Sequence, residues 1–382
     1  MTALPPPQVE RCIGRIDPSR PLLFTVLAKR TFEIRGQLAV PAEEQELFCT
    51  QEEGISADDP GNCPLRRAPE ITPDRDLCDV VVLGTAHRSA MATSADLLFA
   101  APGISRRIRV MGDRFVQGAP GKWRFTPPEP WQEMSLGWDR AYGGIDRGVL
   151  PNPERKENVR RALLCHPGAY PRNDIGRGFS LKGSLLPSDG MPLPNLEDAK
   201  DFLTPERFEC PGPEYWHLQP IPVGLGYLPA HWFPRSVCVG VVAGEWPRCD
   251  GRPIREEEIG TLPQGFVQAQ REAGVEGATI SPLFFQVSAP GMRARLRGDE
   301  RLALQGLEGH STVVLDLPGG APQIAVEGPR GTVHLVPKLF QVLWDIDEKR
   351  LAMVWGASAP LAGDALKGLS EKDLMDLPVR VL

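Results

Sequence analysis

The sequence lacks any long run of apolar residues. No stretch approaches the ~20 apolar residues that a membrane-spanning helix needs, and the first residues, MTALPPPQVERCIGRIDP, contain no apolar segment of the kind found in secretory signals. We therefore expect a cytoplasmic protein that does not bind membranes.

An excess of positive charge is also missing. The chain has 43 lysines and arginines against 49 aspartates and glutamates, and its formal net charge is -6. Nucleic acids and anionic lipids bind proteins through basic patches. We therefore expect no nucleic-acid partner, and we interpret the acidic balance as a property of a well-solvated surface.

Paired cysteines are absent. Zinc ribbons and disulfide scaffolds use closely and regularly spaced cysteines, whereas the eight cysteines here form no C-x-x-C pair. We expect free thiols in a reducing compartment, no metal site and no cofactor. The cysteines occupy positions 12, 49, 63, 78, 165, 210, 238 and 249.

Signatures of catalysis are equally scarce. The sequence contains neither the G-x-S-x-G elbow of a serine nucleophile nor the H-E-x-x-H zinc motif, and its six histidines stand far apart. The glycine pairs Gly118/Gly121 and Gly224/Gly226 match neither a phosphate loop nor a dinucleotide fingerprint. A triad assembled from distant residues stays open, but we do not expect an enzyme.

Proline and glycine are abundant, with 40 and 39 residues. Both favour turns and short strands over helices. The length of 382 residues exceeds the roughly 250–300 residues at which single cores stop growing. We therefore expect a mainly β protein with two β-rich, sandwich-like lobes (1–115 and 236–382), joined by a long irregular middle segment (116–235), with few short helices.

Local patterns indicate the secondary structure. Residues 21–40 read as a hairpin that turns at Arg35-Gly36-Gln37, and residues 332–346 and 350–355 as another. Residues 43–73 read as a surface excursion. Helical composition occurs at 154–165, in patches of 255–272 and in the tail at 363–378, where Pro378 ends it. Further strands are expected at 78–85, 91–99, 105–111, 235–242, 280–287, 292–304 and 311–317.

The stretch from Trp131 to Arg235 is the most distinctive part of the chain. It has little periodicity, and its aromatic content argues against disorder. Large rings could fix such a coil while glycines and prolines set its path, so we interpret it as an ordered recognition scaffold. The rings are Trp131, Trp138, Tyr142, Phe179, Trp216, Tyr227, Trp232 and Phe233.

Carboxylates in the same stretch leave a hydrolytic alternative open. A pair of them beside aromatic platforms could hydrolyse a glycosidic bond; the candidates are Glu133, Asp139, Asp146, Asp174 and Glu197. We expect each of these carboxylates to have an arginine of the same stretch within reach, namely Arg140, Arg147, Arg177 or Arg235. A guanidinium group suits a carboxylate that ties loops together. We hypothesise that Glu197 is such a tie and that it has an arginine partner.

Motifs spread over nearly the whole chain resemble one family, the domain of unknown function 2169, which is seen in bacterial proteins encoded beside type VI secretion spike and PAAR-tip genes. The chain departs from the family at Asn173-Asp174-Ile175, where Asn-Pro is usual, and at Gly291-Met292, where polar residues are usual. The resemblance rests on AKRTF (28–32), DVVVLG (79–84), VMGDR (110–114), MSLGWDRAYGG (134–144), NDIGRGF (173–179), LPNLE (193–197), Pro222, Gly224, Gly226, Trp232, Pro234, Arg235, LFFQVSAP (283–290) and RGDERLALQGL (297–307).

The resemblance implies a non-catalytic adaptor or chaperone that binds a toxic effector and helps load it onto the VgrG–PAAR spike. A structural component of a phage-tail-like particle is a further alternative. Loops such as 43–73 and 246–280 would then select the cargo. The residues we expect to contact the partner or to form the scaffold are Trp138, Arg140, Tyr142, Arg177, Phe179, Glu197, Trp232 and Arg235.

Overall fold

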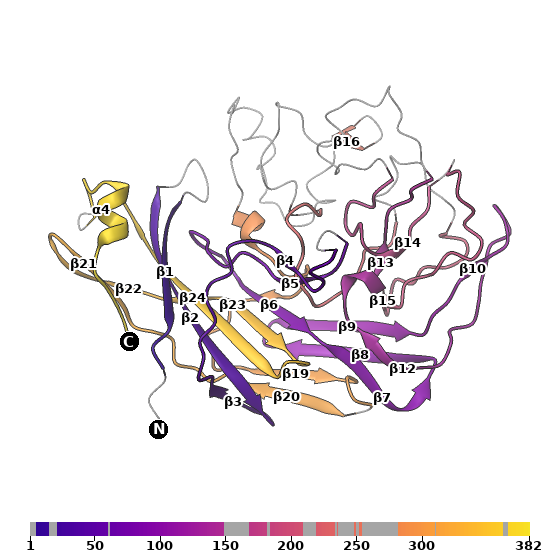
Figure 1. Ribbon diagram of the computed structural model, residues 1–382, viewed down its shortest axis with the longest axis horizontal. Coiled ribbons are helices and arrows are strands. Elements are labelled where there is room, and N and C mark those ends of the chain that lie inside the picture. Colours follow the sequence, from indigo (N-terminus) through magenta and orange to yellow (C-terminus); the bar gives the residue numbers. More distant parts are fainter. Residues whose placement is uncertain are drawn as a thin grey trace.

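The fold is mainly β, as the sequence predicts, with a large curled sheet and few helices (Figure 1). None of the helices in the described ranges has the length and apolar character that crossing a membrane requires. The computed structural model describes residues 5–14, 21–59, 62–148, 168–181, 184–208, 219–233, 235, 248–249, 252–253, 282–309, 311–361 and 366–382.

The large sheet has 12 strands. Eleven of them follow the order β15-β9-β8-β19-β20-β3-β2-β24-β23-β6-β18, and β1 pairs with β2. Most neighbours are antiparallel, but β23 and β6 are parallel, as are β20 and β3. The strands are β1 (Gln8–Gly14), β2 (Leu23–Arg35), β3 (Leu38–Pro41), β6 (Cys78–Leu83), β8 (Ser94–Ala101), β9 (Ile104–Met111), β15 (Leu196–Asp198), β18 (Arg293–Ala294), β19 (Arg301–Gln305), β20 (Thr312–Asp316), β23 (Lys338–Asp345) and β24 (Arg350–Pro360).

Smaller sheets surround the large one. In Figure 1 the sheet of β21 (Ile324–Gly328), β22 (Gly331–Leu335) and β25 (Val379–Val381) lies at one end, with helix α4 (Glu371–Asp376) above it. Ser370 caps α4 in a capping box with Asp373. The two-stranded pairs are β4 (Glu53–Gly54) with β5 (Leu65–Arg67), β7 (Thr85–Ala92) with β12 (Trp131–Ser135), β10 (Val116–Gln117) with β11 (Arg124–Phe125), β13 (Tyr142–Gly143) with β14 (Arg177–Gly178), and β16 (Arg248–Cys249) with β17 (Arg252–Pro253).

Strand β2 is buried on both faces, which explains its almost continuous apolar sequence. Val26 belongs to a core cluster with Ile324 of the small sheet and Leu374 of α4. Leu27, which points the other way, packs with Phe340 of β23. The centre of the large sheet is therefore covered on both sides.

The largest core cluster joins the sheet to the middle segment. It contains Val82 of β6 and Phe99 of β8 together with Trp138, Leu225 and Trp232 from the coil. Each of these side chains is at most 2% exposed. The coil is thus packed against the sheet through a continuous apolar interior.

The turns of the two expected hairpins are confirmed, but the second hairpin is shorter than expected, because residues 331–335 form β22 of the small sheet and β23 begins only at Lys338. Strands β2 and β3 meet at a turn where Gly36 has φ 67°, and β23 and β24 meet at a turn where Lys349 has φ 51°. The apolar run 78–85 is confirmed as the buried strand β6. Short amphipathic helix α4 lies within the expected tail.

Two expected strands are wrong. Residues 282–285 form a 3-10 turn, and the following amides of Val287 and Ser288 donate to the Asp79 carboxylate instead of to a strand. The segment 292–304 is divided into β18 and β19, because Glu300 accepts from the backbone of residues 297 and 298 and Gly298 adopts a φ of 99°.

The two β-rich ends do not form separate sheets. Strand β24 lies between β2 and β23, and β23 lies beside β6, so both ends contribute to one sheet. Whether the ranges 1–115, 116–235 and 236–382 are separate folding units stays a prediction. The expected helices at 154–165 and 255–272, and residues 236–242 of an expected strand, lie outside the described residues.

Candidate functional site

The coil from Trp131 to Arg235, here called the motif block, is built around two tryptophans. Trp138 and Trp232 meet edge to face with ring centroids 5.8 Å apart. Gly224 lies against the Trp138 ring so closely that a Cβ there would be 2.9 Å from Cε2. Gly224 is therefore required by the close approach of the backbone to an indole, and a nucleotide is not needed to explain it.

A second aromatic cluster lies beside the paired segments β13 and β14. The Tyr142 ring is 5.2 Å from that of Tyr170, and the Tyr170 ring is 4.9 Å from that of Phe179. The hydroxyl group of Tyr142 donates to Gln219, 2.9 Å away. These rings are at most 5% exposed, so they hold the block together from inside.

Two buried asparagines bind the backbone of the coil. Asn173 Nδ2 donates to the carbonyl groups of Trp138 and Tyr142 at 2.8 and 3.0 Å. Asn195 Nδ2 donates to the carbonyl of Met111 at 3.0 Å. Both asparagines are 0% exposed. They donate to buried carbonyl groups, and buried backbone groups need such partners.

Glu197 has the arginine partner that we hypothesised. Its Oε2 lies 2.6 Å from Nη2 of Arg114, and its Oε1 accepts from the Leu203 amide at 2.8 Å. The same Arg114 nitrogen donates to the Pro194 carbonyl at 2.9 Å. Burial raises the pKa of Glu197, while Arg114 and the Leu203 amide act against that rise. Glu197 therefore ties β15 to the loop after β9.

Arg235 lies in the core, 3% exposed. It donates to the carbonyl groups of Phe284 and Leu228 and to the carboxylate of Glu52. Its guanidinium group also lies 5.2 Å from the centre of the Phe284 ring. Burial lowers the pKa of Arg235 to about 10. It joins three segments that are distant in the sequence.

Arg140 and Arg177, here called the arginine pair, are the two expected site residues whose side chains are partly exposed. Their Nη1 atoms lie 3.4 and 3.1 Å from Oδ1 of Asn195 and 3.8 and 3.7 Å from Oδ1 of Asp113. Their side chains are 30% and 23% exposed. Arg177 also donates from Nε to the Asp139 carbonyl. Burial and the neighbouring Arg140 lower the pKa of Arg177.

The structure divides the eight expected site residues into two groups. Arg140 and Arg177 reach the surface, and the others are buried by the core. A scaffold role fits this second group, because a side chain inside the core cannot contact a partner. It consists of Trp138, Tyr142, Phe179, Glu197, Trp232 and Arg235.

The remaining candidate carboxylates differ from the expectation that each is near an arginine. Asp174 accepts from Trp232 Nε1 at 2.7 Å and lies 3.2 Å from His231 Nε2. Asp146 accepts from hydroxyl and amide groups around Leu181. Glu133 lies 3.6 Å from His87. Among the described residues, Asp139 has an arginine of the block nearby, Arg140 at 3.5 Å, and Glu197 has an arginine from outside the block, Arg114.

No group of three or more histidine, cysteine, aspartate or glutamate side chains in the described ranges is arranged to hold a metal ion. Four cysteines have described side chains, and all four are free thiols, as their spacing predicts: Cys12, Cys49, Cys63 and Cys78.

Sequence reasoning missed the residues that bind the coil backbone. Asn173, Asn195 and Arg114 all stand inside the quoted motifs NDIGRGF, LPNLE and VMGDR. A short amide side chain beside glycine or proline, in a stretch too aromatic to be disordered, is a signal for a backbone clamp. The sequence therefore contains a signal for these backbone contacts, although the expected site residues were chosen mainly for their aromatic rings.

Comparison with known proteins identifies the family. No curated protein and no solved structure matches the chain. A family model matches residues 20–356, most of the 382 residues. The chain therefore belongs to the family described as "Uncharacterized protein conserved in bacteria (DUF2169)".

Proposed function

We propose that this protein is a non-catalytic adaptor that binds an effector toxin of a type VI secretion system and helps to load it onto the VgrG–PAAR spike. The proposal extends the family resemblance of the sequence. It needs a rigid scaffold that presents a few strong anchors to another protein.

The arginine pair carries this proposal. Asn195 orients both guanidinium groups from within the core, where it is 0% exposed. Among the described residues, neither Arg140 Nη2 nor Arg177 Nη2 donates a hydrogen bond. Donors that are held in place lose little conformational freedom on binding, and arginine is enriched among interface residues that dominate affinity. We expect them to bind carboxylate or carbonyl groups of the effector.

The hydrolytic alternative has less support from the geometry. Glu197 is paired with Arg114 and accepts a backbone amide, and Asp174 accepts from the Trp232 indole. Asp174 connects two parts of the block, and Glu197 connects the block to the loop after β9. Such contacts are those of structural ties, and a general acid and its partner would instead face a shared substrate position.

Affinity capture from the native host tests the adaptor proposal. We expect the tagged protein to retain an effector together with a VgrG or PAAR protein. Substitution Arg140→Ala should weaken retention about 30-fold, as truncating an interface anchor worth about 2 kcal/mol does.

Arg301→Ala is the matched control, because Arg301 is an exposed arginine on β19, 66% exposed and paired with Asp316. It should capture the effector as the unchanged protein does. Circular dichroism checks that both variants fold. Equal capture by a folded Arg140→Ala protein would refute the arginine pair as the binding site, and failure of the unchanged protein to retain any of these proteins would refute the adaptor role.

A further inference from the structure

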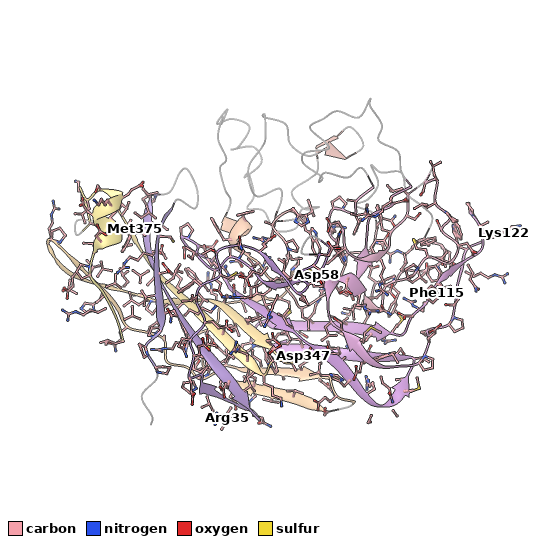
Figure 2. All side chains as sticks on the ribbon, in the orientation of Figure 1. Arg35, Asp58, Phe115, Lys122, Asp347 and Met375 are labelled. Atoms are coloured by element: carbon pink, nitrogen blue, oxygen red, sulfur yellow. The ribbon has the colours of Figure 1, made fainter. Side chains whose placement is uncertain are left out.

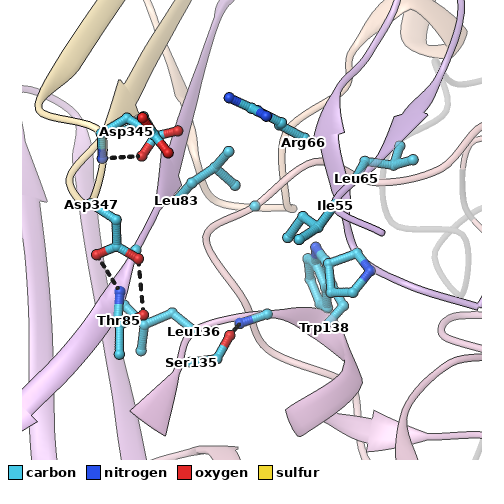
Figure 3. Close-up of a pocket in the computed structure, with 15 residues that line it drawn as sticks. Ile55, Leu65, Arg66, Leu83, Thr85, Ser135, Leu136, Trp138, Asp345 and Asp347 are labelled. Carbon is cyan, nitrogen blue, oxygen red and sulfur yellow. Dashed lines mark hydrogen bonds between the residues drawn. The ribbon is translucent and has the colours of Figure 1, made fainter. Parts of the chain in front are cut away.

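A cleft of about 290 Å³ lies beside the motif block but outside the arginine pair. Figure 3 shows that its walls come from different parts of the chain: the turn between β23 and β24, the junction of β6 and β7, the loop that ends in β5, and Trp138. Its labelled residue Asp347 lies near the middle of the molecule in Figure 2. The volume is at the lower end for small-molecule sites and suits one long side chain.

One wall of the cleft carries three carboxylates. Asp345, Asp347 and Glu348 all come from the turn between β23 and β24, and Arg66 is the only cationic residue among those that line the cleft. Asp347 is oriented by Thr85, whose amide and hydroxyl groups donate to its two oxygens at 3.0 and 2.9 Å (Figure 3). The lining therefore has a net charge of two negative units.

These carboxylates affect one another. Burial raises the pKa of Asp345, and the charges of Glu348 and Asp347 raise it further, while the Glu348 amide and Arg66 lower it. When partial burial and neighbouring negative charges destabilise the ionised form of a carboxylate, a cation placed next to it stabilises that form strongly. The wall is thus suited to a positively charged group.

The opposite part of the cleft supplies an independent indication. The side chain of Trp138 is 2% exposed, and among the described residues its Nε1–H has no hydrogen-bond partner. The indole lines the cleft next to Gly226, where a Cβ would lie 3.5 Å from Nε1. A buried indole N–H usually has an acceptor. An acceptor that enters the cleft beside Gly226 would satisfy it.

The rim adds apolar surface. Ile55 is 57% exposed, and Leu65 and Leu83 continue the apolar lining inward. Lysine and arginine bury their aliphatic stems along such surfaces while the charged head reaches a polar group. The cleft thus has an acidic end, apolar walls and a hydrogen-bond donor without a partner among the described residues. Together these features suit a basic residue of a bound peptide segment.

We propose that this cleft receives one arginine or lysine side chain of the partner protein, with its cationic head beside Asp345, Asp347 and Glu348. The stem lies along Ile55, and a carbonyl group of the same segment accepts from Trp138 Nε1. This assignment rests on the proposed adaptor function, since the partner supplies the side chain. It adds a second contact, of opposite charge to the arginine pair.

A titration with Nα-acetyl-arginine amide tests the cleft directly. Ligand-observed nuclear magnetic resonance should detect binding to the full chain, and the uncharged citrulline analogue, which has nearly the same shape, should not bind. The double substitution Asp345→Asn/Glu348→Gln should weaken binding of the arginine amide about tenfold, because it removes two charges and preserves the side-chain shapes.

The matched control is Asp299→Asn/Glu308→Gln, which removes two exposed charges of the same kinds elsewhere on the surface. It should bind the arginine amide as the unchanged protein does. The single substitution Glu348→Gln, at an exposed position, gives a milder variant if the double variant fails to fold. Absence of binding, equal binding of the citrulline analogue, or equal binding by folded cleft variants would overturn the cation site.

Affinity capture separates this inference from the adaptor proposal. If the unchanged protein and a folded cleft variant retain the effector or spike protein equally, the partner's side chain does not use the cleft and the adaptor role stands. If the unchanged protein retains neither, the adaptor role fails, and with it the assignment to a partner. Weaker retention by the cleft variant, with the control unaffected, supports both.

Discussion

The large sheet and the motif block solve the same physical problem in different ways. In the sheet, backbone groups bind each other: β2 and β24 pair from Leu23↔Pro360 to Glu33↔Arg350. In the block, side chains such as that of Asn173 bind the backbone groups that have no strand partner. Both regions are buried, and buried backbone groups must be satisfied in either case.

The difference teaches where polar residues are structural. A sheet tolerates many side chains because its backbone bonds do not depend on them. A buried coil depends on particular amides, carboxylates and guanidinium groups, since each one replaces a missing backbone bond. Motif residues in such a block are explained first by the fold and only then by function. Four predictions test this contrast.

The largest loss of stability is expected at Asp79, a residue of β6 that binds the backbone of the coil at Val287 and Ser288. The side chain is 0% exposed and accepts from Arg75 at 2.8 Å and from the amides of Val287 and Ser288 at 3.0 Å. Asp79→Ala leaves the buried charge of Arg75 without its counterion, which should lower the free energy of unfolding by about 3–5 kcal/mol. Urea unfolding followed by tryptophan fluorescence measures the change.

Asp96 on β8 is the control for this prediction. Its side chain is 41% exposed and pairs with Arg109 on the surface, so Asp96→Ala should leave the unfolding midpoint nearly unchanged. Similar midpoints for the Asp79 and Asp96 variants would contradict the importance of the buried contact.

The second prediction concerns Asn173 in the coil. Asn173→Ala removes the donor to the buried carbonyl groups of Trp138 and Tyr142, of which the Trp138 carbonyl keeps the Ala141 amide as a second donor. We expect a loss of about 1–3 kcal/mol, at about 0.5–1.5 kcal/mol for each lost hydrogen bond, in the same urea experiment. Asn62→Ala is the control, because Asn62 is exposed and its side chain donates to Asp59, a near neighbour in the sequence. A block held by its rings alone would give equal midpoints for both variants.

The third prediction compares two glycines. At Gly224 an added Cβ would lie 2.9–3.0 Å from the Trp138 ring, so Gly224→Ala should cost about 1–3 kcal/mol through overpacking. At Gly36 nothing lies within 4 Å, but φ is 67°, and Gly36→Ala should cost about 1 kcal/mol through backbone strain. Tryptophan fluorescence of the native state should change for Gly224→Ala only. A change in Gly36→Ala alone would reverse the interpretation.

The fourth prediction concerns the reactivity of two cysteine thiols and requires no change to the sequence. Burial raises the pKa of Cys12 in β1 from 9.0 to about 12 and that of Cys49, in coil after β3, to about 11. At pH 8 both thiols are therefore protonated, and only the thiolate reacts with iodoacetamide. Each should react at least about a hundredfold more slowly than in the urea-unfolded chain.

Mass spectrometry of the labelled peptides measures both rates. The comparison between the two residues tests the loop after β3, which lies outside the motif block: if this loop is as well packed as the sheet, Cys49 is protected nearly as well as Cys12. Rapid labelling of Cys49 in the folded protein would show that this loop opens locally while the sheet stays closed.

The sequence predicts the two regions unequally. Strands such as β6 and the turn at Gly36 are visible in local patterns, because period-two alternation, apolar runs and glycine act over a few residues. The position of β24 between β2 and β23 is not visible, since a local pattern does not specify a strand's partner. In the block, the need for an arginine at Glu197 is predictable from its charge, but Arg114 lies 83 residues away and no local spacing identifies it.

The position of β24 has a consequence for synthesis. During synthesis β2 and β6 leave the ribosome long before residues 338–360 are made. Each of these two strands therefore has an unpaired edge until β23 and β24 pair between them. The nascent chain cannot close its sheet domain by domain, and strand pairing across more than 300 residues is slow. Native folding of the large sheet should therefore follow the synthesis of residues 338–360, and a chaperone could shield the open edges until then.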